Sequence, residues 1–228
     1  MEIGENTWIS SNVTIFPGAR IGANCKIFPG AVIAAIPQDL KFKGEYSTAQ
    51  IGDNVVIREC VTVNRGTDYS GTTRVGNNVL LMAYVHLAHD CIIGNNVVLA
   101  NAVNLGGHVE IDDYVIMGGM SAVHQFCKVG KHAFLSGGSL LNKDVPPYIK
   151  GARQPVTYAG VNSIGLKRRG FINDKIHDIQ DIYRKIFVDD FNITQAVEFI
   201  KNEISESDER NEILDFISRS ERGIIKGY

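Results

Sequence analysis

A six-residue repeat of aliphatic side chains constrains the fold of this 228-residue chain more than any other feature. Every sixth residue from Val75 to Leu141 is aliphatic or methionine, and the residue four positions further on is mostly small. With about a third of positions aliphatic, twelve successive matches would arise by chance on the order of once in a million sequences. The same phase occurs earlier, at Ile3, Ile9, Ile15, Ile21, Ile27, Ile33, Ile51, Ile57 and Val63.

A period of six fits neither a helix, which repeats every three to four residues, nor a single strand, which repeats every two. It fits short strands joined by corners, with three hexads closing one coil of 18 residues. The repeat therefore predicts a parallel β-helix. Segments such as IGANCK (21–26), VGNNVL (75–80) and IGNNVV (93–98) resemble the left-handed β-helix of the hexapeptide-repeat acyltransferases, and the handedness is implied by that resemblance.

The hexads divide the chain into two predicted domains. Residues 1–148 form the left-handed β-helix, interrupted by polar, glycine-containing loops at 34–50 and 64–74. Beyond Pro146 and Pro147 the spacing becomes helical, at 174–187, 193–204 and 209–220, so residues 149–228 form a C-terminal α-helical domain. Asn173 is the expected cap of its first helix. We expect the apolar helix faces to cover the end of the solenoid, whose strand edges would otherwise be unpaired.

Composition excludes several function classes. The 25 acidic and 23 basic residues give no overall positive field, so no nucleic-acid partner is expected. Because the chain has no apolar run long enough to cross a bilayer and no secretory signal at its first residues, we expect a cytoplasmic protein without stable membrane insertion. The four cysteines form no Cys-x-x-Cys pair, and Cys25, Cys91 and Cys127 occupy the small position of the hexad, where a thiol packs inside the coil.

The 18-residue coil predicts which residues stack on one another. Residues i and i+18 should lie about 4.8 Å apart on the same side of the solenoid. Several imidazoles beside a carboxylate and a bare glycine then form a candidate proton-transfer site, with His86 and His124 adjoining it. We expect His132 and His177 to be ordinary surface histidines. The two predicted columns are His89, Gly107 and Gln125, and beside them Asp90, His108 and Phe126.

A zinc site is one alternative for this cluster, because three histidines hold zinc on the left-handed β-helix of γ-class carbonic anhydrases. Those enzymes build the triad across subunits and lack a helical C-terminal domain of this kind. We therefore prefer an interpretation without metal.

Five longer segments resemble the acyl-[acyl-carrier-protein]:UDP-N-acetylglucosamine O-acyltransferase family over nearly the whole chain. The resemblance implies transfer of an (R)-3-hydroxyacyl group from acyl carrier protein to the 3-hydroxyl of UDP-N-acetylglucosamine, the first step of lipid A synthesis. It also implies a homotrimer with sites between neighbouring β-helices. No cofactor is expected, because the acyl group arrives on the phosphopantetheine of the carrier protein. The segments are VHLAHD (85–90), GGHVE (106–110), GGMSAVHQFC (118–127), DVPPYI (144–149) and GVNSIGLKRRGF (160–171).

Three residues suit the chemistry of this reaction. A sugar hydroxyl is a poor nucleophile, and a base at His89, which matches the family's catalytic histidine, would accelerate its attack about 10² to 10⁴-fold. Gly107 lets its backbone N–H approach the developing oxyanion. Asp90 is the candidate to orient His89, but adjacent strand residues point to opposite faces, so the two side chains meet only in a corner conformation.

The remaining assignments are implied by the resemblance alone. Asp39 matches a sugar-binding residue, and a turn carboxylate is the alternative for it. Arg168 and Arg169 could bind the diphosphate or form a solvated helix face. Because some members carry glutamate in place of Ile164, the nucleotide contact made there is not transferred. The matching sets are His86, His108, His124 and Gln125 for the sugar and diphosphate, Asn162, Arg168 and Arg169 for the nucleotide and carrier-protein end, and Gly137, above Asn101 and Gly119, for acyl length.

Two further hypotheses stay open at this point. One is a related enzyme, either the N-acyltransferase of the same pathway or a coenzyme A-dependent sugar acetyltransferase. The other is a structural β-helix without catalytic activity, which the outward histidines and glycine argue against. The acyl length and the choice between a 3-hydroxy and a 3-amino sugar are not determined by the sequence.

Overall fold

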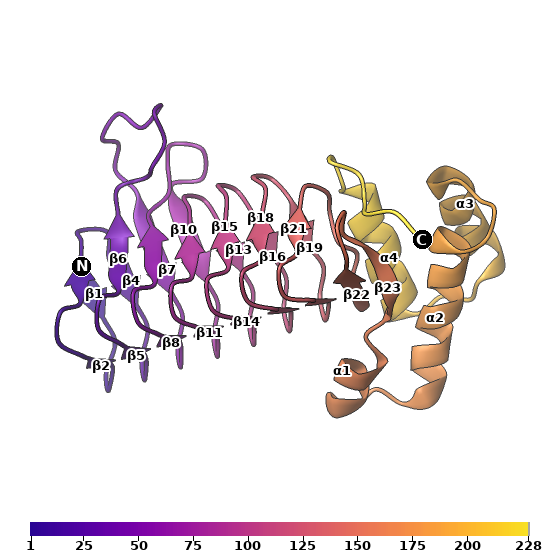
Figure 1. Ribbon diagram of the computed structural model, residues 1–228, viewed down its shortest axis with the longest axis horizontal. Coiled ribbons are helices and arrows are strands. Elements are labelled where there is room, and N and C mark those ends of the chain that lie inside the picture. The colour runs from indigo at the N-terminus through magenta and orange to yellow at the C-terminus, as the bar shows by residue number, and fades with distance from the viewer. Residues whose placement is uncertain (228) are drawn as a thin grey trace.

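A computed structural model describes residues 1–227, which form a parallel β-helix followed by helices (Figure 1). Three sheets run along the solenoid, one on each side of the coil. The first sheet contains β1 (Glu2–Ile3), β4 (Ala19–Ile21), β7 (Thr48–Ile51), β10 (Thr72–Val75), β13 (Ile92–Ile93), β16 (Glu110–Ile111) and β19 (Lys128–Val129). The second contains β2 (Trp8–Ile9), β5 (Lys26–Ile27), β8 (Val56–Ile57), β11 (Leu80–Leu81), β14 (Val98–Leu99), β17 (Ile116–Met117), β20 (Phe134–Leu135), β22 (Ile149–Ala152) and β23 (Thr157–Val161). The third contains β3 (Thr14–Ile15), β6 (Val32–Ala35), β9 (Thr62–Asn64), β12 (His86–Leu87), β15 (Asn104–Leu105), β18 (Ala122–Val123) and β21 (Leu140–Leu141).

The strand register confirms the predicted coil length. Leu87 pairs with Leu105, which pairs with Val123, so successive partners are 18 residues apart. Partners lie further apart only across the two loops: Ile21 pairs with Ile51, and Ile51 pairs with Val75. The extra residues leave the solenoid as two loops, at 36–47 between β6 and β7 and at 65–71 between β9 and β10.

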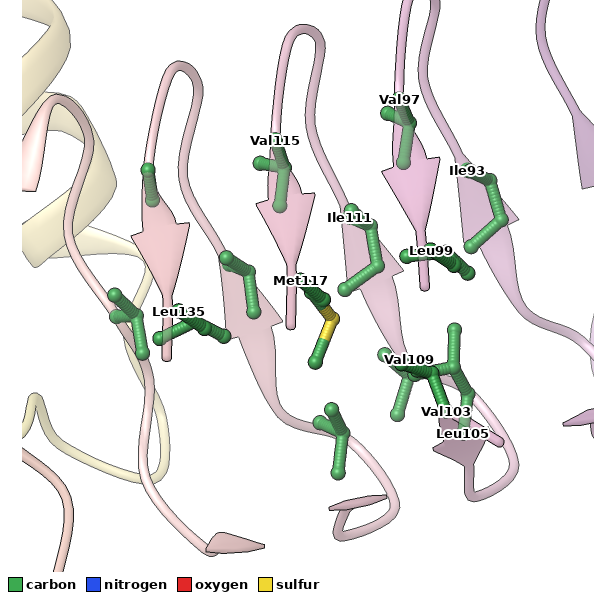
Figure 2. Close-up of a cluster of buried hydrophobic side chains, with 14 of the residues drawn as sticks. Ile93, Val97, Leu99, Val103, Leu105, Val109, Ile111, Val115, Met117 and Leu135 are labelled. Carbon is green, nitrogen blue, oxygen red and sulfur yellow. The ribbon is translucent and has the colours of Figure 1, made fainter. Parts of the chain in front are cut away.

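The aliphatic stack predicted from the hexads fills the solenoid. Figure 2 shows side chains from successive coils, among them Val97, Leu99 and Met117, meeting along its axis. Cys25, Cys91 and Cys127 are fully buried within this stack. Burial raises the pKa of the Cys91 thiol to about 12, so it stays protonated and packs as a small apolar residue. The prediction that these cysteines are packing residues is confirmed.

The corners require an unusual backbone. At one position per hexad the chain adopts a positive φ, which costs most residues energy but costs asparagine less. Asn24, Asn54 and Asn96 occupy such corners, and so do Asp90 (φ 59°) and His108 (φ 62°). At these corners side chains leave the alternating pattern of a strand, which matters for the site described below.

The C-terminal segment covers one end of the solenoid. β22 pairs with β20 and turns back antiparallel to β23, extending the second sheet. The helices are α1 (Ser163–Arg168), α2 (Asn173–Phe187), α3 (Ile193–Glu203) and α4 (Asp208–Ser218). Tyr183 of α2 is fully buried and donates a hydrogen bond to the carbonyl of Pro147 at 2.6 Å, which fixes α2 against the last coil.

The three predicted helical segments correspond to α2, α3 and α4, and the helix considered for Arg168 corresponds to α1, whereas the β22–β23 hairpin was not anticipated. The predicted cap at Asn173 is wrong. Ile172 holds the cap position without a side-chain hydrogen bond, and Asn173 is the first residue of α2. Within residues 1–227, none of the helices combines the length and apolar character needed to cross a bilayer.

Candidate active site

One edge of the solenoid, where the chain turns from the third sheet into the first, carries most of the candidate residues. Both loops leave from this edge, and Figure 1 shows them projecting side by side. The next three turns, between β12 and β13, β15 and β16, and β18 and β19, carry His89, Gly107 and Gln125. Because each turn is one coil further along, the loops and this column form a continuous surface.

The His89 ring lies directly against Gly107. A Cβ atom added to Gly107 would come 2.5 Å from Cε1 and 2.7 Å from Nε2 of His89, so the ring occupies the space that any other residue would fill. The stacking predicted from the 18-residue coil is thus confirmed. Among the hydrogen bonds within residues 1–227, none has the Gly107 N–H as its donor. A free backbone donor therefore accompanies the imidazole.

Asp90 meets His89 through the corner conformation that the prediction required. With φ at 59°, Asp90 turns its carboxylate back toward its neighbour, and Oδ2 lies 2.8 Å from Nδ1 of His89. The carboxylate is buried, at 3% exposure. Burial acts to raise the pKa of Asp90, but hydrogen bonds from His89, Ser70 and Thr67 outweigh it and hold that pKa well below its usual value. The ionised Asp90 accepts a hydrogen bond from the Nδ1–H group of His89, which leaves Nε2 of His89 free to accept a proton.

His108 lies against the His89–Asp90 pair, and His86 lies on β12, the strand that leads into this turn. His108 packs edge-on against His89, with centroids 4.9 Å apart, and stacks on Phe126 at 4.3 Å. Nδ1 of His86 lies 2.7 Å from the hydroxyl of Thr62. Burial lowers the pKa of both His86 and His108 below the ordinary 6.5. At neutral pH these rings offer hydrogen bonds without charge, which suits a ligand rich in hydroxyl groups.

His89, Asp90 and His108 also place three possible metal ligands within 4.8 Å of one another. The Asp90 oxygens already accept hydrogen bonds from His89, from the backbone and hydroxyl of Thr67 and from the hydroxyl of Ser70. A cation would have to displace these donors. The cluster is therefore better suited to proton transfer than to chelation.

Known proteins share both parts of this architecture. The family model described as UDP N-acetylglucosamine O-acyltransferase, domain 2, matches residues 144–225, and the bacterial transferase hexapeptide model matches residues 1–35 and 72–107. An acyl-[acyl-carrier-protein]–UDP-N-acetylglucosamine O-acyltransferase from Thiobacillus denitrificans is 41% identical over 191 residues, covering 83% of this chain and 74% of the relative. One from Stenotrophomonas maltophilia is 44% identical over 196 residues, covering 85% and 74%. This chain belongs to the acyl-[acyl-carrier-protein]–UDP-N-acetylglucosamine O-acyltransferase family.

Solved structures agree with this assignment. A UDP-N-acetylglucosamine acyltransferase from Bacteroides fragilis superposes with a TM-score of 0.96 at 47% identity, covering 99% of this chain and 95% of that one. The enzyme from Francisella novicida has the same TM-score at 45% identity, covering 98% and 83%. The fold of this O-acyltransferase is thus the left-handed β-helix with a C-terminal helical region that the sequence predicted.

Asp39 lies in the 36–47 loop of this O-acyltransferase, which leaves the solenoid at the same edge as the histidine cluster. Its Oδ1 accepts a hydrogen bond from the backbone of Lys41 at 3.0 Å, as expected of a turn carboxylate. Burial lowers the pKa of His108, and the negative charge of Asp39 opposes this shift by a smaller amount. Asp39 can therefore both stabilise its own turn and influence the charge of the candidate site. His124 and Gln125 are exposed further along the same edge.

The other predicted residues of this O-acyltransferase lie on different edges. Gly137 follows β20, at the turn from the second sheet to the third, and a Cβ added to it would lie 3.2 Å from the Gly119 carbonyl. A Cβ on Gly119 would in turn lie 3.0 Å from the Asn101 carbonyl, so the small-residue column is present. Arg169 contacts the remaining edge, where Tyr114 turns from the first sheet to the second. One chain thus distributes its candidate residues over all three edges.

Asn162 and Arg169 are both engaged inside the chain. The buried Asn162 accepts from the Gly165 amide at 3.3 Å, capping α1, and donates to the His132 carbonyl at 2.9 Å. Arg169 donates to the Tyr114 carbonyl at 2.9 Å. Arg168, in contrast, is exposed at the end of α1.

The prediction that His132 is an ordinary surface residue is wrong. It is only 7% exposed and stacks between Tyr114 and Tyr148, at 4.8 and 5.6 Å. Burial lowers its pKa to about 4. The 18-residue relation of Tyr114 to His132 was the available signal.

Sequence reasoning also missed the residues that hold Asp90. Thr67 and Ser70 lie in the 65–71 loop, outside the hexads, where no repeat relates them to the column. No signal in the sequence could have placed them there.

Proposed function

We propose that this chain transfers an (R)-3-hydroxyacyl group from acyl carrier protein to the 3-hydroxyl of UDP-N-acetylglucosamine. The proposal rests chiefly on the packing of the His89 ring against Gly107, with the Asp90 carboxylate on its far nitrogen. Family membership indicates the substrates, since the relatives are named for them.

The geometry supports each step of an acyl transfer. Nε2 of His89 takes the proton of the sugar hydroxyl as its oxygen attacks the thioester carbonyl carbon. The carbonyl oxygen becomes negative, and the Gly107 N–H is available to stabilise it. Collapse of the intermediate breaks the carbon–sulfur bond, and the departing thiolate recovers the proton from Nε2. Asp90 keeps the ring in the required tautomer and stabilises the transient imidazolium.

We also propose a homotrimer that shares its sites between neighbouring β-helices. In one chain, Gly137 and Arg169 lie on edges other than the edge of His89, so a single copy does not bring acyl-length and nucleotide-binding residues to the base. A second copy facing the His89 edge would supply them. Sedimentation of the purified protein tests this: a monomer that is fully active would contradict the shared site.

No metal and no tightly bound cofactor belong to this proposal, because the phosphopantetheine arrives with the carrier protein. The four free thiols support a reducing compartment and hence a cytoplasmic location.

The activity is tested with purified protein, a panel of 3-hydroxyacyl carrier proteins and UDP-N-acetylglucosamine or its 3-amino analogue, with products read by mass spectrometry. Wild type should form an acylated sugar nucleotide. His89→Ala should lose at least about 10²-fold in rate while keeping its fold. Equal rates for both proteins would remove His89 from the mechanism, and no product from wild type would favour a structural β-helix.

A further inference from the structure

The 65–71 loop holds the Asp90 carboxylate through several hydrogen bonds in addition to that of His89. Thr67 donates its backbone N–H to Oδ1 and Oδ2 at 3.1 and 3.2 Å, and its hydroxyl to Oδ2 at 2.7 Å. Ser70 donates its hydroxyl to Oδ1. The Asp90 backbone N–H in turn donates to the Thr73 hydroxyl at 2.9 Å, so the residue is fixed at both ends.

These hydrogen bonds fix the orientation of the Asp90 carboxylate and also keep it ionised. A buried carboxylate with a single partner would be free to rotate or would take up a proton, because an ionised group is costly to bury unless hydrogen bonds compensate it. Each Asp90 oxygen has a hydroxyl donor from the loop, and Oδ2 keeps one direction for Nδ1 of His89. The loop therefore decides which way the carboxylate faces.

The loop is itself anchored. The Gly71 amide donates to the Thr67 carbonyl at 2.8 Å, closing the turn. The Asp68 amide donates to Glu45 of the 36–47 loop at 3.3 Å, and the Thr48 amide donates to the Gly71 carbonyl at 2.9 Å. Both loops thus brace the position of the two hydroxyl groups.

We propose that Thr67 and Ser70 are positioning residues for acyl transfer, which act through Asp90 to hold the His89 ring against Gly107. The inference rests on the proposed function of the His89 site. At 4% exposure Thr67 is out of reach of a substrate, and Asp90 is equally buried. The contribution of Thr67 therefore lies in the rate of the bound complex and not in substrate affinity, whereas the exposed Ser70 acts through its hydrogen bond to Oδ1 of Asp90.

The test compares Thr67→Val, which removes the hydroxyl at nearly constant shape, with Thr67→Ser, which restores it. Thr67→Val should lower kcat about 10- to 100-fold, because a misplacement of the base approaching 1 Å costs that much. KM for the sugar nucleotide and for the acyl carrier protein should stay within about twofold of wild type, since neither substrate touches Thr67. Thr67→Ser should recover most of the rate. Ser70→Ala, which leaves Thr67 intact, should show a smaller loss of the same kind.

The decisive measurement repeats Thr67→Val in an Asp90→Ala background. If Thr67 acts through Asp90, the double variant should be no slower than Asp90→Ala alone. Thr7→Val is the matched control, because the Thr7 hydroxyl also bonds inside the solenoid, to the Gly22 carbonyl at 2.8 Å, but in the first coil. It should leave kcat unchanged.

Each outcome decides the question. Wild-type kcat in both Thr67→Val and Ser70→Ala, or a full additional loss in the Asp90→Ala background, would overturn the inference while leaving the proposed function standing. An inactive wild type would overturn both. If Thr67→Val does not fold, Ser70→Ala and its combination with Asp90→Ala decide in its place.

Discussion

Gly107→Ala should disable the enzyme through one methyl group. The Cβ of alanine would lie 2.5 Å from Cε1 of His89, whereas ordinary van der Waals contact begins near 3.4 Å, so the ring has to retreat by about 0.9 Å. A displacement of about 1 Å in a catalytic group costs about 100-fold in rate, or about 2.7 kcal/mol of transition-state stabilisation. Gly107 is not among the glycines with positive φ, so alanine suits its backbone and the chain should still fold.

The assay measures kcat and the thermal midpoint for Gly107→Ala alone and in a His89→Ala background. With the ring removed, the methyl group has room. The double variant should therefore be no slower than His89→Ala, and Gly107→Ala should destabilise this background less than wild type. A folded Gly107→Ala enzyme with kcat within threefold of wild type would refute the packing argument.

Three further predictions follow from the other edges of the solenoid. Burial lowers the pKa of His132 to about 4 in the folded protein, whereas its pKa in the unfolded chain is about 6.5. Between these two values the unfolded chain binds the proton and the folded protein does not. The stability present above pH 6.5 is therefore lost as pH falls from 6.5 to about 4. The free energy of unfolding of wild type should fall by about 2.5 kcal/mol more between pH 7.5 and pH 4.5 than that of His132→Phe, which keeps the ring stack but has no proton to bind. Urea titrations at the two pH values measure this difference, and equal losses in both proteins would contradict the prediction. Gly137→Leu should shift the preferred acyl chain to a shorter length in the carrier-protein panel, and an unchanged preference would separate Gly137 from the acyl groove. Asn162→Ala removes the N-cap of α1 and the hydrogen bond to the His132 carbonyl. The free energy of unfolding should fall by about 1 to 2 kcal/mol. A fall of less than about 0.5 kcal/mol would show that neither hydrogen bond stabilises the fold.

Regular parts of the fold were predictable because a solenoid repeats the same geometry in each coil. The aliphatic hexads identify the buried stack, and the 18-residue step places His89 over Gly107 and His108 against Phe126. These relations need no knowledge of distant contacts. Where the repeat ends, prediction fails, as at the cap of α2. The repeat places Tyr114 on His132, but the burial of His132 also depends on Tyr148 and Phe171, which lie beyond the last hexad.

The sequence by itself determined the period, the core and the columns of this protein, because each depends only on spacing along the chain. The tertiary structure alone decided that Asp90 turns toward His89, since that contact needs a left-handed corner and hydrogen-bond donors from a loop about 20 residues earlier. It also decided that Arg169, a candidate for the nucleotide end, contacts a different edge than the base. Spacing identifies which residues stack on one another. The orientation of a charged side chain depends instead on the hydrogen-bond partners that stabilise its charge, and for Asp90 these partners lie in a loop outside the hexad repeat.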